Sequence, residues 1–313
     1  PLGALSKAQL NKGYAVLEEL EKAVSKKKPS TAELQRLSSR FYTIIPHSFG
    51  RVRPPTLSSA EDVKKKVEML NVLSDVEVAQ GLIDKKGSGG KGGVLEHPLD
   101  TNYKSLDADI SLVKPSCAEY KRIARYIANT GPRYTSVKTL FLFRLDRRSE
   151  GARFRAVEKV ENRKLLWHGT NAAVVAAIIS QGLRIMPFSG GRVGRGIYLA
   201  NMLEKSFGYI RRAPNRWGFL FLVEAPLGKA HTITVDNPSL RAPPKGHDSV
   251  HAVGRFGPDP KDDEVVEFDG KEIVVPTGKP VTRPETASSR FHHDEHLIYS
   301  EAGVRIRYIV VIQ

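Results

Sequence analysis

Five glycines lie within nine residues at 85–93 (KKGSGGKGG), and this tract divides the chain into two parts with different sequence patterns. Each glycine inside a helix costs about 1 kcal/mol relative to alanine, so no helix is expected to continue through the tract. Segments rich in Gly and Ser are typical of flexible linkers. The 313 residues leave room for two domains, and we predict them at residues 1–93 and 94–313.

Residues before the glycine-rich tract carry the signals of three helices. Ser6, Ser30 and Ser59 each stand at a helix start, and the first two are followed three residues later by Gln or Glu, which is a capping pattern. Apolar residues then recur at helical spacing: Leu10, Leu17, Leu20 and Val24 in the first segment and Val63, Val67, Leu70 and Leu73 in the third. We predict helices that begin at these serines and end before Pro29, at Phe41 and at Leu82. Amphipathic helices must bury their apolar faces, so this part is predicted to be a small bundle.

Residues after the tract show a different pattern, in which short apolar runs alternate with Gly and Pro turns. We predict strands at 137–145, 165–167, 197–200, 219–223, 273–275, 297–299 and 306–312. Two helices are expected among them, from Ser116 to Thr130 with Gly131 as its end, and from Ala172 to Ser180. Short strands rarely separated by helices favour antiparallel or mixed sheets, so the predicted fold class is α+β rather than a doubly wound parallel sheet.

The chain is strongly basic. Lys and Arg number 49 against 34 Asp and Glu, which gives a formal net charge of +15. Such a charge favours polyanionic partners such as nucleic acids, phosphates, dinucleotides or acidic protein tails, although a solvated basic surface explains it equally well. The lysine runs 26–28 and 64–66 are predicted to lie on solvated helix faces rather than to be dedicated nucleic-acid contacts.

Cysteine content and hydropathy exclude several classes of protein. Cys117 is the only cysteine, so no disulfide and no cysteine-based zinc site forms within the chain, and a reducing compartment is expected. The longest apolar run, 172–179, is far shorter than the ~20 residues of a membrane-spanning helix, so no membrane partner is expected. No basic-then-apolar leader follows Pro1, and the absence of an initiator Met suggests a fragment or a processed chain.

Two motifs are ambiguous when taken singly. Gly190–Gly196 (GGRVGRG) lets backbone amides approach a phosphate, but it precedes a strand, so a flexible turn is the simpler interpretation. His292–His296 (HHDEH) matches a zinc-peptidase pattern that requires both histidines on one helix face. The residues after it are strand-like, and a strand would hold His292 and His296 about 13 Å apart. We therefore expect no metal site here, which leaves Glu295 as a candidate functional carboxylate beside a strand.

Two further motifs place candidate ligand-binding residues next to strands. His168 follows the apolar run 165–167 and precedes Gly169, whose backbone groups can face a ligand. Tyr198 lies on a predicted strand and Tyr209 follows a turn eleven residues later, so the pair can sandwich a planar ring. A satisfied core histidine and two core tyrosines explain these residues equally well when each is taken alone.

Together and in this order, the motifs resemble those of the poly(ADP-ribose) polymerase family of NAD-dependent ADP-ribosyltransferases. They are LLWHGT (165–170), GLRI (182–185), GRGIYLA (194–200), EKSFGY (204–209) and DEHLIY (294–299). Residues 1–7, 41–50 and 67–80 resemble the regulatory helical domain of the family, and 97–103 resembles the start of its transferase domain. Residues 184–196 and 235–250 are similar to the corresponding segments of a DNA-dependent member with a short donor loop.

The resemblance implies a helical regulatory domain at 1–93, without its first helix, and a catalytic fold of two small, mainly antiparallel sheets at 94–313. The His, Tyr and Glu triad of the family falls on His168, Tyr198 and Glu295, with Lys205 as a further catalytic candidate on the acceptor side. NAD is the implied co-substrate and no metal is implied. The positions that bind NAD in the family fall on His168, Gly169, Thr170, Arg184, Tyr198, Ser206 and Tyr209, and Ala177 stands where relatives often have glycine.

The resemblance also implies a mode of regulation. Asp75 matches an acidic position of the family's inhibitory helix, and a DNA-break sensor in the parent protein, outside this chain, would release the inhibition. Acceptor proteins (histones or the enzyme itself), mono- rather than poly-ADP-ribosylation, and a nuclear location are further implications. Two other functions are weighed: a basic nucleic-acid-binding module with an inert transferase cleft, and a zinc hydrolase built on His292 and His296.

Overall fold

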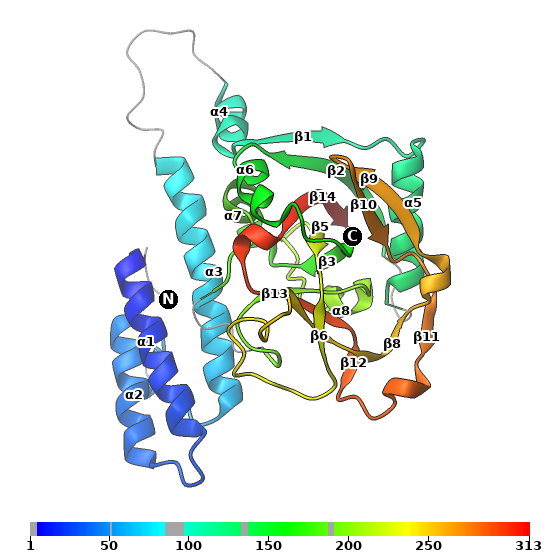
Figure 1. Ribbon diagram of the computed structural model, residues 1–313. Coiled ribbons are helices and arrows are strands. Elements are labelled where there is room, and N and C mark those ends of the chain that lie inside the picture. Colours follow the sequence, from blue (N-terminus) through cyan, green and yellow to red (C-terminus); the bar gives the residue numbers. More distant parts are fainter. Residues whose placement is uncertain (1–4, 51, 85–96, 133–136, 187–190) are drawn as a thin grey trace. The chain divides into compact units, whose positions relative to one another are not determined.

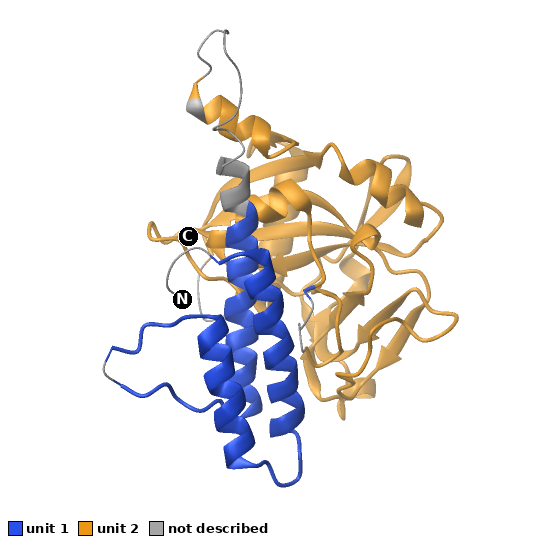
Figure 2. Ribbon diagram, turned by 90° about the vertical axis from the view of Figure 1, so that its left-hand side faces the viewer, with its two compact units in different colours: residues 1–92, 186–190 blue, residues 93–185, 191–313 orange. Residues whose placement is uncertain are grey.

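The structure is a computed structural model that describes residues 5–50, 52–84, 97–132, 137–186 and 191–313. The chain divides into two compact units, residues 1–92 with 186–190 and residues 93–185 with 191–313 (Figure 2). The glycine-rich tract at 85–93 and the predicted domain boundary lie outside the described residues.

The first unit is helical, and its helices begin at the predicted serines. They are α1 (Lys7–Val24), α2 (Thr31–Ile44) and α3 (Ala60–Asp84) (Figure 1). Ser6 and Gln9 form a complete capping box, and the Ser30 side chain accepts a hydrogen bond from the backbone N–H of Glu33. At the third start, Ser59 Oγ accepts from the N–H of Asp62 at 3.1 Å. The α2 helix runs three residues beyond the predicted end at Phe41.

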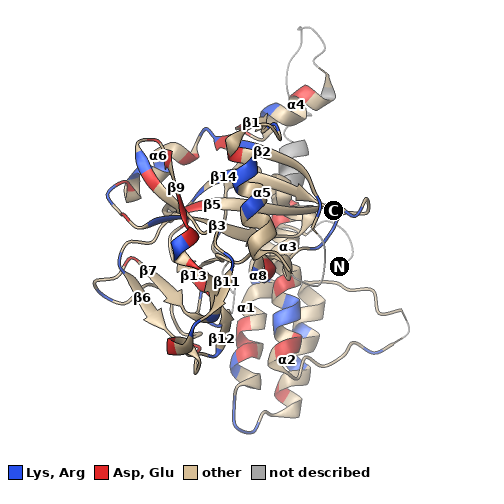
Figure 3. Ribbon diagram, turned by 90° about the vertical axis from the view of Figure 1, so that its right-hand side faces the viewer, with Lys and Arg blue, Asp and Glu red and all other residues tan. Residues whose placement is uncertain are grey.

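One apolar core holds the three helices side by side (Figure 2). Its most buried members include Leu10, Leu17, Leu20, Leu37, Phe41 and Leu70. Acidic and basic residues alternate along the outside of α1 and α2, where ion pairs such as Arg40 with Glu19 form (Figure 3). The lysines at 26–28 are exposed as predicted, as are Lys64 and Lys65, but Lys66 is half-buried against the rings of Tyr42 and His47.

The second unit is built on three sheets in the described residues. Its largest sheet has the strand order β1-β2-β14-β5-β3-β10-β9, and the others have the orders β4-β13-β7-β6 and β11-β8-β12. The strands are β1 (Ala108–Leu112), β2 (Thr139–Arg147), β3 (Arg163–Gly169), β4 (Ile197–Leu199), β5 (Gly218–Pro226), β6 (Ala230–Ile233), β7 (Ser249–Ala252), β8 (Gly254–Pro258), β9 (Glu264–Phe268), β10 (Lys271–Val275), β11 (Pro280–Thr282), β12 (Phe291–His293), β13 (Glu295–Ile298) and β14 (Arg305–Ile312). The helices are α4 (Pro98–Ser105), α5 (Ala118–Thr130), α6 (Glu150–Phe154), α7 (Val175–Gln181) and α8 (Leu203–Phe207).

The centre of the largest sheet forms the main core of this unit. Strands β3, β5 and β14 are antiparallel neighbours, and Trp167, Leu220, Leu222 and Val310 are fully buried in one cluster. The α5 helix contributes Tyr126, whose ring centroid lies 4.7 Å from that of Trp167. This packing holds β3 rigidly, and β3 ends at His168 and Gly169.

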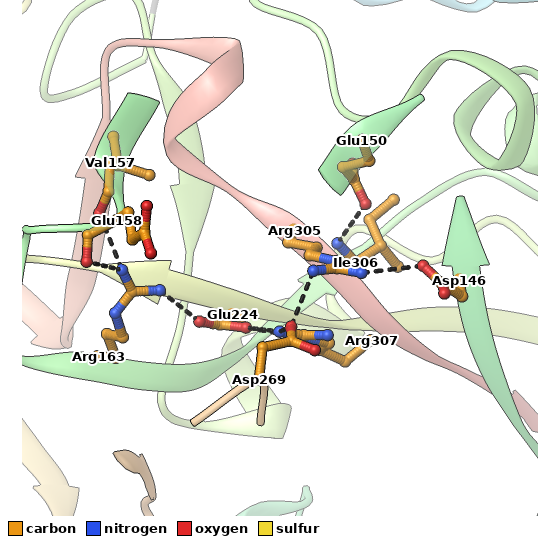
Figure 4. A network of polar contacts seen from close by, with 10 residues as sticks. All are labelled: Asp146, Glu150, Val157, Glu158, Arg163, Glu224, Asp269, Arg305, Ile306 and Arg307. Carbon is orange, nitrogen blue, oxygen red and sulfur yellow. Dashed lines mark hydrogen bonds and ion pairs between the residues drawn. The ribbon is translucent and has the colours of Figure 1, made fainter. Parts of the chain in front are cut away.

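A buried ionic network closes the opposite end of β3 (Figure 4). Glu224 on β5 is fully buried. Its carboxylate accepts hydrogen bonds from Arg163 Nη1 at 2.7 Å and from Arg307 Nε at 2.7 Å. The Arg163 guanidinium also donates to the carbonyl oxygens of Val157 and Glu158. Each buried charge therefore forms hydrogen bonds to an opposite charge, and Arg163 adds the two carbonyl oxygens, which is the condition for ions to be tolerated in an interior.

The predicted α+β class and the order of a helical part before a mixed-sheet part are confirmed. The sheets differ in number and size from the two small ones expected, because seven strands pair into one sheet. Most strand pairs are antiparallel, while β10 with β3, β12 with β8 and β6 with β7 are parallel. The α5 helix ends at Gly131 as expected, but with φ of −73° rather than in the left-handed region. Among the described residues, no helix combines the length and apolar character needed to cross a membrane.

Candidate active site

The candidate site lies where the largest sheet meets the four-stranded sheet, at the ends of β3 and β4. Trp167 on β3 and Ala200, just after β4, exchange two backbone hydrogen bonds, with N···O distances of 2.7 and 3.0 Å. Because these bonds join the two strand ends, they bring the motifs LLWHGT and GIYLA together as neighbours in space. Tyr198 pairs in register with Leu297 of β13, so the third motif, DEHLIY, lies on the next strand.

His168 is held in one orientation by the backbone of β4. Its Nδ1 lies 3.0 Å from the carbonyl oxygen of Tyr198, so Nδ1–H donates this bond. Burial lowers the pKa of His168, although the bond to Tyr198 opposes the shift, and the ring is therefore neutral at physiological pH. In that tautomer Nε2 carries a free lone pair and can accept a hydrogen bond from a sugar hydroxyl.

Tyr198 joins the strand to the glycine-rich loop. Its hydroxyl donates to the carbonyl oxygen of Gly194 at 2.8 Å and accepts from the N–H of Val193 at 3.0 Å. Tyr299 donates to the carbonyl oxygen of Val193 at 2.7 Å, and burial raises the pKa of Tyr299 to about 12. Residues 191–194 thus form a tight turn fastened by two tyrosines, which agrees with the turn interpretation of this motif.

The short helix α8 places Lys205 beside Glu295 of β13 and Ser206 beside the end of β3. Lys205 Nζ lies 2.6 Å from Glu295 Oε1, and the Glu295 side chain is only 4% exposed. Ser206 Oγ donates to the carbonyl oxygen of Trp167 at 3.2 Å, which sets α8 against the end of β3. Sequence patterns did not predict α8, because five residues are too short to show a helical period.

Gly169 is required by the close approach of α8 to β3. A Cβ atom at this position would lie 2.0 Å from the carbonyl oxygen of Ser206. Gly169→Ala must push the two backbones apart. We therefore expect release of nicotinamide from NAD, the activity that the sequence resemblance implies, to fall at least about 100-fold, because displacements near 1 Å have effects of that size. Steady-state kinetics and the melting temperature check this result.

Gly208→Ala is the matched control for Gly169→Ala. It lies on the same segment with φ of −61°, and its added Cβ would meet its nearest atom, the carbonyl oxygen of Lys205, at an ordinary 3.5 Å. A Gly169→Ala protein with the parent's kinetics and melting temperature would contradict the close approach of Ser206.

The remaining predicted NAD-binding residues differ in burial. Tyr209 is 57% exposed, and Lys205 Nζ, which pairs with Glu295, lies over its ring at 5.8 Å from the centroid. Thr170 is buried directly after β3. Arg184 lies beyond α7 and is half-buried, and its predicted role at the phosphate side stays a prediction. Ala177 is buried within α7.

The histidine-rich motif does not form a zinc-peptidase helix. His292 lies exposed on β12, whereas His296 is buried on β13, on a separate strand segment. A different group that can hold a metal ion occurs in the described residues: His251, Asp294 and His296, whose candidate ligand atoms lie within 4.8 Å of one another. Sequence reasoning missed this group, since His251 precedes the motif by 41 residues.

Buried histidines near the site make stability depend on pH. Burial, with help from His292 and Lys205, lowers the pKa of His293 to about 4, and burial also lowers the pKa values of His168 and His296. The unfolded chain therefore binds more protons than the folded one once the pH falls below about 6.5. We expect the free energy of unfolding to be constant above about pH 7 and to fall by up to ~1.4 kcal/mol per pH unit for each such histidine between pH 6.5 and 5.

Calorimetric melting at pH 7.5, 6.0 and 5.0 measures this slope. His293→Asn should make it shallower, because it removes a histidine whose pKa burial lowers. Equal melting temperatures at all three pH values would contradict the burial of neutral histidines.

Comparison with known proteins agrees with the geometry. Residues 117–313 match the family model described as the poly(ADP-ribose) polymerase catalytic domain, and residues 1–103 match the one described as the regulatory domain of the same enzymes. The match and the fold together define a poly(ADP-ribose) polymerase catalytic domain that follows a helical regulatory domain. The chain belongs to the poly(ADP-ribose) polymerase family.

Three relatives show where within the family the similarity is high. The chain is 48% identical over 310 residues to "Protein mono-ADP-ribosyltransferase PARP3" of Gallus gallus, covering 99% of this chain and 58% of the relative. It is 45% identical to the protein of the same name from Homo sapiens, covering 100% and 59%, and 36% identical to "Poly [ADP-ribose] polymerase 1" of Xenopus laevis, covering 100% and 31%. The similarity that residues 184–196 and 235–250 predicted to one member of the family is thus confirmed as similarity to proteins named PARP3, and the chain spans under three fifths of the length of these relatives.

Proposed function

We propose that this chain transfers ADP-ribose from NAD to protein side chains with release of nicotinamide, and that it adds single units rather than chains. The observation that carries the proposal is the buried Glu295 carboxylate, held 2.6 Å from Lys205, which in turn lies over the exposed ring of Tyr209. The names of the similar proteins, mono-ADP-ribosyltransferases, support the transfer of single units.

The proposed binding mode follows from groups already oriented in the site. Backbone groups of Gly169 and the Ser206 hydroxyl would bind the nicotinamide carboxamide, and Tyr209 would stack on its ring. The Nε2 lone pair of His168 would accept a hydrogen bond from a hydroxyl of the adenine ribose. Thr170 and Arg184 would line the adenosine and phosphate side. These assignments use the resemblance together with the orientation of His168 and Ser206 described above.

The proposed chemistry needs only one carboxylate. The nicotinamide–ribose bond breaks with its electron pair going to nicotinamide, which leaves as a neutral molecule and needs no strong general acid. Positive charge then develops at the anomeric carbon, as in glycoside hydrolysis. The ionised Glu295 would bind a ribose hydroxyl and favour this charge, and Lys205 would keep the carboxylate oriented. An acceptor side chain forms the new bond to the anomeric carbon and loses a proton.

A direct test measures nicotinamide release and labelled product together. The chain is incubated with labelled NAD and histones, with and without a chelator, and products are separated by size. We expect release that survives the chelator and single ADP-ribose units on the histones or on the chain itself. Residues 94–313, which lack the helical unit and its proposed restraint, run in the same assay. No release from either folded sample would overturn the proposal and favour a basic nucleic-acid-binding module, which the net charge of +15 would suit.

The proposal extends to regulation and location. The helical unit would restrain the catalytic unit until DNA breaks, sensed outside this chain, release it, as part of a nuclear response to DNA damage. Support comes from the match of residues 1–103 to the regulatory domain and from Asp75, a buried carboxylate on α3. Such restraint is a population shift between a closed and an open state.

Replacing Asp75 tests the restraint. We expect Asp75→Asn to raise DNA-independent nicotinamide release by about 5-fold or more, the lower range of typical coupling between sites. Glu68→Gln, an exposed carboxylate on the same helix, serves as the control and should leave the rate unchanged. Identical rates in both variants, measured under conditions where each is folded, would show that Asp75 does not take part in restraint.

A further inference from the structure

Asp294, the residue directly before Glu295, is one of the most enclosed charges in the described chain, with a side chain only 1% exposed. Both of its oxygens accept hydrogen bonds. Oδ1 accepts from the N–H of Gly254 at 2.8 Å and from Arg283 Nη1 at 2.7 Å. Oδ2 accepts from Asn201 Nδ2 at 2.6 Å and from Arg283 Nη1 at 2.9 Å. Burial alone would raise the pKa of Asp294, but the contacts with His251 and Arg283 hold it well below its usual range.

The donors to Asp294 come from segments that carry the candidate catalytic residues. Asn201 lies between β4, which carries Tyr198, and α8, which carries Lys205. Gly254 begins β8, which pairs with β12 directly before Asp294. The Asp294 carboxylate thus connects the backbone directly before Glu295 to the segment before Lys205. The side chains of Glu295 and Lys205 themselves form a hydrogen bond of 2.6 Å.

A metal ion is the competing explanation for this cluster. Neither ring nitrogen of the buried His296 has a hydrogen-bond partner in the described structure, and the His251 and His296 rings stack with centroids 4.3 Å apart. However, four donor contacts already occupy the lone pairs of Asp294, and the positive charge of Arg283 lies within 3 Å of both oxygens. A cation would have to displace one of these donors and approach Arg283, which opposes its binding.

We infer that Asp294 is a positioning residue for the reaction: its carboxylate fixes Glu295 and the segment carrying Lys205 relative to each other. The inference rests on the proposed role of Glu295. Asp294 does not touch the reacting atoms in this scheme, so its loss should slow the chemical step while leaving the binding of NAD largely intact.

Exchanging the side chains of Asn201 and Asp294 distinguishes a positioning role of Asp294 in the reaction from a role in the stability of the fold alone. Asp294→Asn is expected to lower kcat for nicotinamide release by about 10- to 100-fold with KM for NAD changed less than about threefold, because reacting groups move by a fraction of an ångström. The double variant Asn201→Asp with Asp294→Asn restores an amide–carboxylate pair and the buried negative charge, and it should recover kcat to within about fivefold of the parent. Asp109→Asn, which removes the exposed partner of Arg148, is the control.

Several results would overturn the inference. They are an unchanged kcat in folded Asp294→Asn, no recovery in the double variant, and stoichiometric zinc in the parent together with loss of turnover on chelation. If Asp294→Asn does not fold, Asn201→Ala keeps every charge and should lower kcat about tenfold at constant KM, and an unchanged kcat there would also overturn it. Glu295→Gln runs in the same assay: if it keeps the parent rate, the proposed role of Glu295 in the reaction fails, independently of the results for Asp294.

Discussion

Glu295→Gln is expected to lower the rate of nicotinamide release from NAD by about 10²–10³-fold, the usual effect of removing one transition-state contact. The amide keeps the size of the carboxylate and can still bind a hydroxyl, but it has no charge to stabilise the positive anomeric carbon. Lys205 keeps a polar neighbour, so the fold should survive. Single-turnover release of nicotinamide, beside a melting curve, measures both.

The control for Glu295→Gln is Glu285→Gln, which removes an exposed carboxylate and should leave release unchanged. The substrate's binding should change little, because the lost interaction strengthens only as charge develops. Release within twofold of the parent in folded Glu295→Gln would mean that another group stabilises the transition state. The buried Lys205–Glu295 pair would then be structural.

Local signals predicted much of the helical unit, and the reason is physical. Side-chain caps at Ser6, Ser30 and Ser59 and the apolar period act within a few residues, so the sequence alone shows where each helix begins. The apolar runs also located seven of the strands, but they did not predict β1, β6, β7, β8, β9, β11 and β12, which are short and largely polar or exposed on one side. The pairing of the strands could not be predicted, because β14 at the end of the chain lies between β2 and β5, and nothing within those segments specifies that neighbour.

The candidate site likewise contains residues that the sequence predicted and contacts that it could not predict. Motifs predicted six site residues, and the structure brings all of them to adjoining strand ends and to α8: His168, Gly169, Tyr198, Lys205, Ser206 and Glu295. The anchoring of Glu295 was not visible in the sequence, because Asn201 and Asp294 are 93 positions apart. Asn201 also sits between two recognised motifs without belonging to either. Contacts of this kind arise from tertiary packing and have no local pattern.

The ionic network at the other end of β3 has the second large expected effect, and it falls on stability (Figure 4). Glu224→Gln leaves the buried guanidiniums of Arg163 and Arg307 without the charge that lies 2.7 Å from each. Removing one partner of a buried ion pair costs about 3–5 kcal/mol, since the remaining charges stay away from water. For a unit of this size we expect the melting temperature to fall by roughly 10 °C.

Kinetic measurements distinguish Glu224→Gln, which is expected to lower stability, from Glu295→Gln, which is expected to lower the reaction rate. Arg163 begins β3 and His168 lies five residues further on, a separation of about 16 Å along the strand, so folded Glu224→Gln should keep the parent's kcat and KM. Asp109→Asn breaks an ion pair whose side chains are 61% and 64% exposed, and it should leave the melting temperature close to that of the parent. Thermal melts and kinetics below the transition test both variants. An unchanged melting temperature for Glu224→Gln would show that water or another group compensates the two arginines.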